Sequence, residues 1–132
     1  MPGTEIAPQP QPAAPDPHHA VRNPWWWLAL VILALNDHLW KVGGALPSLL
    51  TGKLSDIAGL VVAPAAVALL LGLRGRTGVA IGHGFVAAWF TAMNTSDGFA
   101  AAWSDAFALL GLPWQGVVDW PDLLTLPALA LS

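Results

Sequence analysis

The chain has 132 residues, of which 55% are hydrophobic and only 10% are Asp, Glu, Lys or Arg, whereas about 25% of an average soluble domain is charged. This length gives room for one domain, and the composition excludes disorder for most of the chain. The formal net charge is −3 with five basic residues and no cysteine. The sequence therefore has no electrostatic footprint for nucleic acid and no disulfide or thiolate chemistry. This balance is typical of a small multi-pass membrane protein with the lipid bilayer as its surroundings.

Residues 1–23 differ in composition from the rest of the chain. The prolines in this segment are Pro2, Pro8, Pro10, Pro12, Pro15 and Pro17. Such a segment cannot bury enough apolar surface to order itself, and its prolines favour polyproline II. We expect a disordered Pro-rich tail over residues 1–23 and a transmembrane helical domain over residues 24–132. His18 and His19 could hold a metal loosely, although solvated histidines in a mobile tail are the favoured interpretation.

The first predicted span covers residues 24–42. Pro24 occupies the first-turn position that proline tolerates. Trp25 and Trp40 would lie roughly 22 Å apart on a helix, at about 1.5 Å per residue, so tryptophans would mark both bilayer interfaces. A signal peptide is the alternative, with an apolar core at 25–35 and a small-residue cleavage site near 43–45. The Trp-rich start and the polar residues before that site argue against it.

Two further stretches, 54–73 and 77–96, are each long enough to cross the hydrocarbon core. A loop over residues 43–53 is expected before the first of them, since Gly and Pro cluster there. Pro64 should kink the second span, a distortion that neighbouring helices can absorb. The small-xxx-small spacing from Gly78 to Gly82 allows close helix packing.

The C-terminal part has two interpretations. In the favoured one, residues 99–112 form a short interfacial or re-entrant helix, and residues 121–132 form a partial helix that covers about half a bilayer. In the other, residues 99–118 are a fourth span and the end is a tail. The predicted fold class is therefore all-α, an integral membrane bundle of three to four transmembrane helices.

Basic residues set the expected orientation. Arg74 and Arg76 lie in the tightest loop, which the positive-inside rule places in the cytoplasm together with Arg22. The N-terminus is then cytoplasmic, and Lys41 and Lys53 lie outside. Three basic residues against two favour this orientation.

Polar residues gather at particular helix ends. Antiparallel neighbours bring the end of the first span, the start of the second and the end of the third to one side of the membrane. The predicted polar face contains Asn36, Asp37, His38, Lys41, Lys53, Ser55, Asp56, Asn94, Ser96 and Asp97. Asp119 and Asp122 would join this face under the favoured layout.

Each member of the polar face also has a local explanation. Ser55, Asp56 and Asp122 can cap helix N-termini, and Asp97 precedes Gly98 in a turn signal. Asp37 lies near a helix end where the dipole disfavours an anion. It can pair with Lys41 at i+4, or it can be a functional ionisable group in the membrane, and both interpretations stay open.

A metal site is a further alternative at this face. Asp37, His38 and Asp56 could supply carboxylate and imidazole ligands to zinc or a harder divalent metal. Adjacent residues on a helix point about 100° apart, and no HExxH, HxxxH or DxxxD spacing occurs. No cofactor is therefore predicted, and a divalent metal at His38 and Asp56 is kept only as an alternative. His83 lies nearer the opposite side, where we expect a hydrogen-bonded structural histidine.

Three segments carry a resemblance to known proteins. LNDHLWK at 35–41, LTGKLSDIAGL at 50–60 followed by Pro64, and DLLTLP at 122–127 resemble a group of small bacterial multi-pass membrane proteins. The TGKLSD piece is the most specific part. The resemblance implies placement in the bacterial inner membrane and no mechanism, since no activity is established for the group. A more distant likeness to VanZ-like membrane proteins, through a polar Asp near a helix start, carries no residues over.

These observations leave three hypotheses for the function. The first is a non-enzymatic membrane component whose polar face holds helix ends together or binds a membrane protein partner or a second copy. The second is a membrane-embedded, metal-assisted hydrolase that uses Asp37, His38 and Asp56 as ligands or acid–base groups. The third is a proton or ion pathway, which requires Asp37 and His83 to line one cavity.

Overall fold

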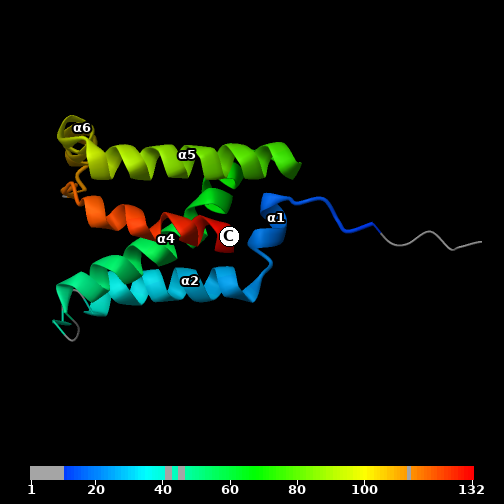
Figure 1. The fold of residues 1–132 in the computed structure, drawn as a ribbon, viewed down its shortest axis with the longest axis horizontal. Helices are drawn as coiled ribbons and strands as arrows, with labels where there is room; N and C mark the ends of the chain where they lie inside the picture. The colour runs from blue at the N-terminus through cyan, green and yellow to red at the C-terminus, as the bar shows by residue number, and fades with distance from the viewer. Residues whose placement is uncertain (1–10, 41–42, 45–46, 113) are drawn as a thin grey trace, which may run out of the picture.

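The computed structural model describes residues 11–40, 43–44, 47–112 and 114–132, and this part of the chain is helical without strands. Its helices pack into a bundle with α4 at the centre, in contact with α2, α5 and η2 (Figure 1). The elements are α1 (Pro17–Ala20), α2 (Pro24–Leu35), the π-helix η1 (Asn36–Trp40), α4 (Ser48–Leu70), α5 (Gly75–Thr95), α6 (Asp97–Leu109) and the 3₁₀-helix η2 (Trp120–Leu131). The all-α prediction is confirmed for these residues.

The start of α2 follows from its local sequence. Pro24 is the first helical residue, as predicted, and the side chain of Asn23 accepts a hydrogen bond from the Trp25 amide at 3.0 Å. This is the N-cap arrangement, which satisfies one of the amide groups left without a helical partner. The indole of Trp26 then donates to the carbonyl of Val62 at 3.2 Å and ties α2 to α4.

The second long helix begins earlier than predicted. α4 starts at Ser48, directly after Pro47, so residues 48–53 are helical and not part of a loop. Proline is the last breaker in this stretch, and the helix continues from it without interruption. Ser55 and Asp56 consequently lie inside α4, and their predicted role as N-terminal caps is wrong.

The C-terminal helix also departs from its expected form. η2 follows the predicted partial helix in extent but is a 3₁₀-helix, whose rise of roughly 2.0 Å per residue gives it a length of about 24 Å. Pro127 lies inside the helix and removes an amide donor that a regular α-helix would use, whereas Pro121 lies in the first turn, where the amide has no helical partner. Asp119 occupies the N-cap position of η2, but its side chain makes no capping hydrogen bond. The side chain of Asp122 binds Lys53, so the prediction that Asp122 caps the helix is wrong.

Part of the predicted disordered tail is helical. Pro17 is buried at the start of α1, which lies against α4 and α5. The carboxylate of Asp16 accepts hydrogen bonds from the amides of His18 at 2.8 Å and Gly75 at 2.7 Å. One side chain thus caps α1 and also meets the positive end of α5. Apolar burial did not predict this order because it depends on a hydrogen bond to a residue far along the chain.

Close packing joins α5 to α4 at Pro64. A methyl group added at Gly82 would overlap the carbonyl oxygen of Pro64, and one added at Gly78 would lie 3.1 Å from a ring carbon of Pro17. Both glycines are buried. The small-xxx-small spacing therefore acts as predicted, since only a residue without a Cβ lets these backbones approach so closely.

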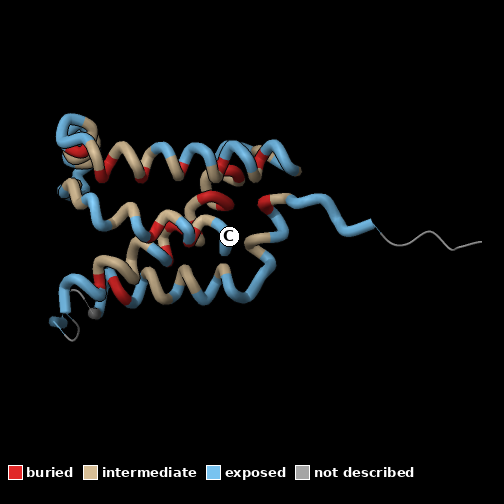
Figure 2. The backbone as a smooth tube through the Cα atoms, viewed as in Figure 1, coloured by how far each residue is buried: buried red, intermediate tan, exposed pale blue. Residues whose placement is uncertain are grey.

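Only some of the large apolar side chains are buried. Leu60, Val86 and Phe90 lie in the hydrophobic core, and small and polar residues are buried as well, with Asn36 and Pro64 the largest side chains that are fully enclosed. Large apolar side chains lie on the outside, including Leu70 at 87% and Leu109 at 89% exposure, and exposed segments run along the helices in Figure 2. Soluble domains rarely present so much contiguous apolar surface.

Among the described residues, one helix, Ser48–Leu70, is long and apolar enough to cross a membrane. This finding rests on the length and composition of the helix. The other predicted spans correspond to α2 with η1 and to α5, and the predicted short helix at 99–112 corresponds to α6.

Candidate functional site

The polar residues of the sequence gather at one end of the bundle. The end of η1, the start of α4, the end of α5 and the start of η2 all lie on the left of Figure 1. Antiparallel packing of the neighbouring helices produces this arrangement. We call this end, with Asn36, Asp37, Lys53, Ser55 and Asp122, the polar end.

Asn36 is the most deeply buried polar residue of this end, with 0% of its surface exposed. Its amide nitrogen donates to the backbone carbonyl of Thr51 at 2.7 Å and connects η1 to α4. Its side-chain oxygen is buried and accepts no hydrogen bond from the described residues. Asn36 begins the π-helical turn, a distortion that is frequent at functional sites.

Two side-chain pairs connect helices at the polar end. The hydroxyl of Ser55 donates to the carboxylate of Asp37 at 3.0 Å. The ammonium of Lys53 forms an ion pair with the carboxylate of Asp122, and these side chains are only 24% and 20% exposed. The pairs link η1 and η2 to α4. The predicted partner of Asp37, Lys41, lies outside the described residues.

Other residues of the predicted polar face are not drawn into these pairs. His38 and Asp97 are exposed at the surface. Asn94 is buried, and its amide donates to the Phe90 carbonyl of its own helix at 3.0 Å. Ser96 is the N-cap of α6, accepting from the Phe99 amide at 3.2 Å, so Asp97 belongs to a helix start and not to an isolated turn.

The metal alternative requires several ligands to converge. Within the described ranges, no group of three or more His, Asp or Glu side chains could hold a metal ion. His38 is exposed at the surface, and Asp56 lines an apolar cavity between the helices. The residues proposed for a metal-assisted hydrolase are therefore not assembled into a metal centre in this part of the chain.

An apolar cavity of about 400 Å³ begins beside the polar end. Along α4 its wall runs from Ser55 and Asp56 through Gly59 to Val67, so its polar groups lie at one end only. Aromatic side chains of α5 and α6 face this α4 wall across the cavity. Its aromatic lining consists of Phe85, Trp89, Phe90 and Trp103.

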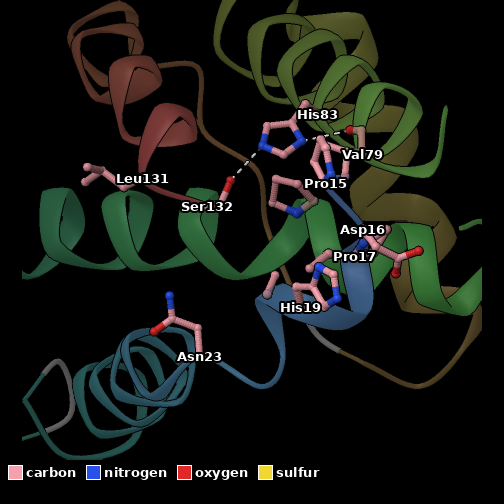
Figure 3. A pocket seen from close by; sticks show the side chains of 12 residues that line it. Pro15, Asp16, Pro17, His19, Asn23, Val79, His83, Leu131 and Ser132 are labelled. Carbon is pink, nitrogen blue, oxygen red and sulfur yellow. Dashed lines mark hydrogen bonds between the residues drawn. The ribbon is translucent and has the colours of Figure 1, made fainter. Parts of the chain in front are cut away.

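A second cavity, of about 300 Å³, lies at the opposite end of the bundle (Figure 3). There His83 Nδ1 lies 2.8 Å from the carbonyl of Val79, and His83 Nε2 lies 2.8 Å from the hydroxyl of Ser132. A carbonyl only accepts, so Nδ1 carries the proton and donates. The expected hydrogen-bonded histidine is confirmed. The Ser132 hydroxyl is also 2.8 Å from the Leu129 carbonyl, so its one proton has two acceptors within reach when the imidazole is neutral.

Asp16 lies at the wall of this second cavity. The backbone amides of His18 and Gly75, in that order of strength, stabilise its carboxylate and lower the pKa of Asp16 below the usual value of 3.8. His19 is another wall residue, so the cavity collects ionisable groups from the N-terminal segment. Asp37 belongs to η1 at the polar end of the bundle and does not line this cavity. The proton or ion pathway would require Asp37 and His83 to line one cavity, and of these two residues only His83 lines this one.

Sequence reasoning missed the ion pair of Lys53 with Asp122 and the contacts of Asp16. Lys53 and Asp122, and likewise Asp16 and Gly75, lie more than fifty residues apart in the chain. The buried Thr51 and Thr125 were also missed. Their only sequence signal is a single hydroxyl residue within an apolar stretch.

Comparison with models of protein families, with curated proteins and with solved structures gives no match for this chain.

Proposed function

We propose that this chain is a small integral membrane protein of the bacterial inner membrane, as its resemblance implies, with a non-catalytic role. Three spans would be formed by α2 with η1, α4 and α5, and η2 would enter the bilayer without a regular α-helical span. The single observation that carries the proposal is the large number of leucine, tryptophan and other large apolar side chains that lie exposed on the outside of the helices. The N-terminus would be cytoplasmic.

The surroundings of the exposed side chains decide whether their exposure is costly. In water, each exposed methylene costs about 0.8 kcal/mol relative to burial, and the outward leucines and tryptophans would drive aggregation. In lipid the same side chains cost nothing, while small residues allow the helices to pack by close contact. Gly78 and Gly82 against Pro17 and Pro64 are packed in this way.

The polar end supports a structural or partner-binding role. Its ion pair and its Ser55–Asp37 hydrogen bond each join two elements. Such pairs hold helix ends in register at the membrane surface, where water still reaches the exposed carboxylate of Asp37. The exposed His38 and Asp97 beside them offer polar contacts to a membrane protein partner or a second copy.

Membrane placement is tested by extraction and labelling. We expect the expressed chain to stay in the membrane pellet after alkaline carbonate treatment. The chain has no cysteine, so single substitutions report sidedness directly. Ser48→Cys, at the polar end, should react with a membrane-impermeant maleimide in intact cells, and Arg76→Cys, at the other end, only after permeabilisation.

Two results would overturn the proposal. Release of the chain by carbonate would show that it does not span the bilayer. Labelling of Ser48→Cys and Arg76→Cys from the same side would show that α4 does not cross it. The inverse sidedness would keep the membrane placement and reverse the orientation.

A further inference from the structure

The cavity beside the polar end has two chemically different regions. Because α4 and α5 run antiparallel, Trp89 lies toward the Asp56 end of the cavity and Phe85 toward the other end. Trp103 of α6 packs edge-to-face on Trp89 with ring centroids 5.8 Å apart. One region thus combines a carboxylate, a hydroxyl and two indole rings, and the remainder is apolar.

This combination has a defined chemical preference. A carboxylate attracts a cation, and the faces of tryptophan rings add cation–π attraction, which is strongest in a desolvated site. The apolar remainder favours an alkyl chain, since burial of each methylene contributes about 0.8 kcal/mol. The cavity volume of about 400 Å³ lies toward the lower end of small-molecule sites, which suits one alkyl chain better than two.

We propose that this cavity binds a single-chain amphiphile with an ammonium head group, the head beside Asp56, Trp89 and Trp103 and the chain along Gly59 toward Val67. The inference goes beyond the structural role proposed above. It concerns a site between folded helices, so binding can be measured on the purified chain whether or not its membrane placement holds.

Gly59 provides a specific way to close the cavity. A Cβ added at Gly59 would meet no heavy atom within 4 Å, so the space beside it is open. Gly59→Leu therefore fills the cavity without a clash at its first carbon, and leucine is a better helix former than glycine. Gly84→Leu is the matched control, because Gly84 is also helical and unobstructed but is exposed and does not line the cavity.

The experiment measures radiolabelled dodecyltrimethylammonium binding to the immobilised full chain in dodecyl maltoside micelles. The micelle supplies the same alkyl chain with a neutral head group in excess, so saturable binding reports recognition of the ammonium. We expect saturable binding that unlabelled dodecyltrimethylammonium displaces and dodecanoate does not. Asp56→Asn should weaken it at least tenfold, Gly59→Leu should abolish it, and Gly84→Leu should leave it unchanged.

Thermal unfolding of each variant, followed by circular dichroism, separates lost binding from lost folding. Wild-type binding by a folded Gly59→Leu variant would overturn the proposal, as would equal displacement by dodecanoate or the absence of saturable binding to folded wild type. If Asp56→Asn fails to fold, the Gly59→Leu and Gly84→Leu pair and the dodecanoate competition still decide the question. Failure of carbonate retention with intact ammonium binding would remove only the membrane proposal.

Discussion

Different kinds of contact hold the helices together at the two ends of the bundle. At the polar end, charged and hydroxyl side chains join separate elements, as in the Lys53–Asp122 ion pair and the Ser55–Asp37 hydrogen bond. At the opposite end, backbone groups take part in the contacts: Gly82 lies against the Pro64 carbonyl, and the Gly75 amide donates to the Asp16 carboxylate. Substitutions at Gly82 should therefore act through volume, and substitutions at Lys53 or Asp122 should act through charge.

The largest expected effect is at Gly82. Gly82→Ala places a methyl group on the Pro64 carbonyl, and overpacking of this kind costs about 1–3 kcal/mol. The same change at Gly84 meets open space, so Gly84→Ala should stabilise α5 by up to about 1 kcal/mol through helix propensity. Thermal unfolding in detergent measures both. Equal shifts in the same direction at the two positions would contradict the close packing.

The polar end should respond to charge and not to volume. Lys53→Met leaves the Asp122 carboxylate in a site where it is only 20% exposed, without its ammonium partner. Loss of one partner costs 3–5 kcal/mol for a fully buried pair and about 0–1 for an exposed one, so we expect about 1–2 kcal/mol here. The unfolding transition in mild detergent measures this loss.

The double variant Lys53→Met, Asp122→Leu is the control for that measurement. Removal of both charges should recover most of the loss, because no unpaired charge remains. A double-mutant cycle isolates the pair term. Additive effects of the two single substitutions would show that the ion pair does not couple α4 to η2.

The same contrast explains what the sequence could predict. The start of α2 at Pro24 and the close packing at Gly78 and Gly82 follow from local rules, so periodicity and spacing were sufficient. The gathering of polar helix ends also followed, since antiparallel neighbours need only short connections. Each of these depends on residues close together in the chain or on one helix.

The features that could not be predicted depend on distant partners. Asp16 accepts a hydrogen bond from the Gly75 amide far along the chain, and Lys53 meets Asp122 where η2 packs on α4. The Pro-rich composition predicted disorder for the segment that contains Asp16, and the position of Asp122 near a helix start predicted a capping role. Apolar patterning also gave no indication of the cavity, which arises from the space left between α2, α4, α5 and α6.

Asn36 should have an intermediate effect. Asn36→Leu removes the hydrogen bond to the backbone carbonyl of Thr51, a buried residue. A buried polar group left without its partner costs about 1–3 kcal/mol of unfolding free energy. Asn36→Leu also removes the buried side-chain oxygen that has no donor among the described residues, which offsets part of that cost. We therefore expect a loss at the lower end of this range, measured by thermal unfolding. A larger loss would show that this oxygen is satisfied in solution.

The smallest expected effect is at Asp16, and it depends on pH. Amide hydrogen bonds lower the pKa of Asp16 below 3.8 in the folded chain. The carboxylate therefore stabilises the docked N-terminal segment at pH values above the pKa that Asp16 has in the unfolded chain. This contribution is lost as the pH falls through the pKa of the folded chain. The Gly75 amide resonance should therefore titrate with a midpoint below 3.8, and Asp16→Asn should remove that titration. Retention of the titration in Asp16→Asn would assign it to another carboxylate. A midpoint at or above the unperturbed value in the wild-type chain would mean that α1 is not held to α5 by this side chain, and the contrast between the two ends would then rest on the glycine packing alone.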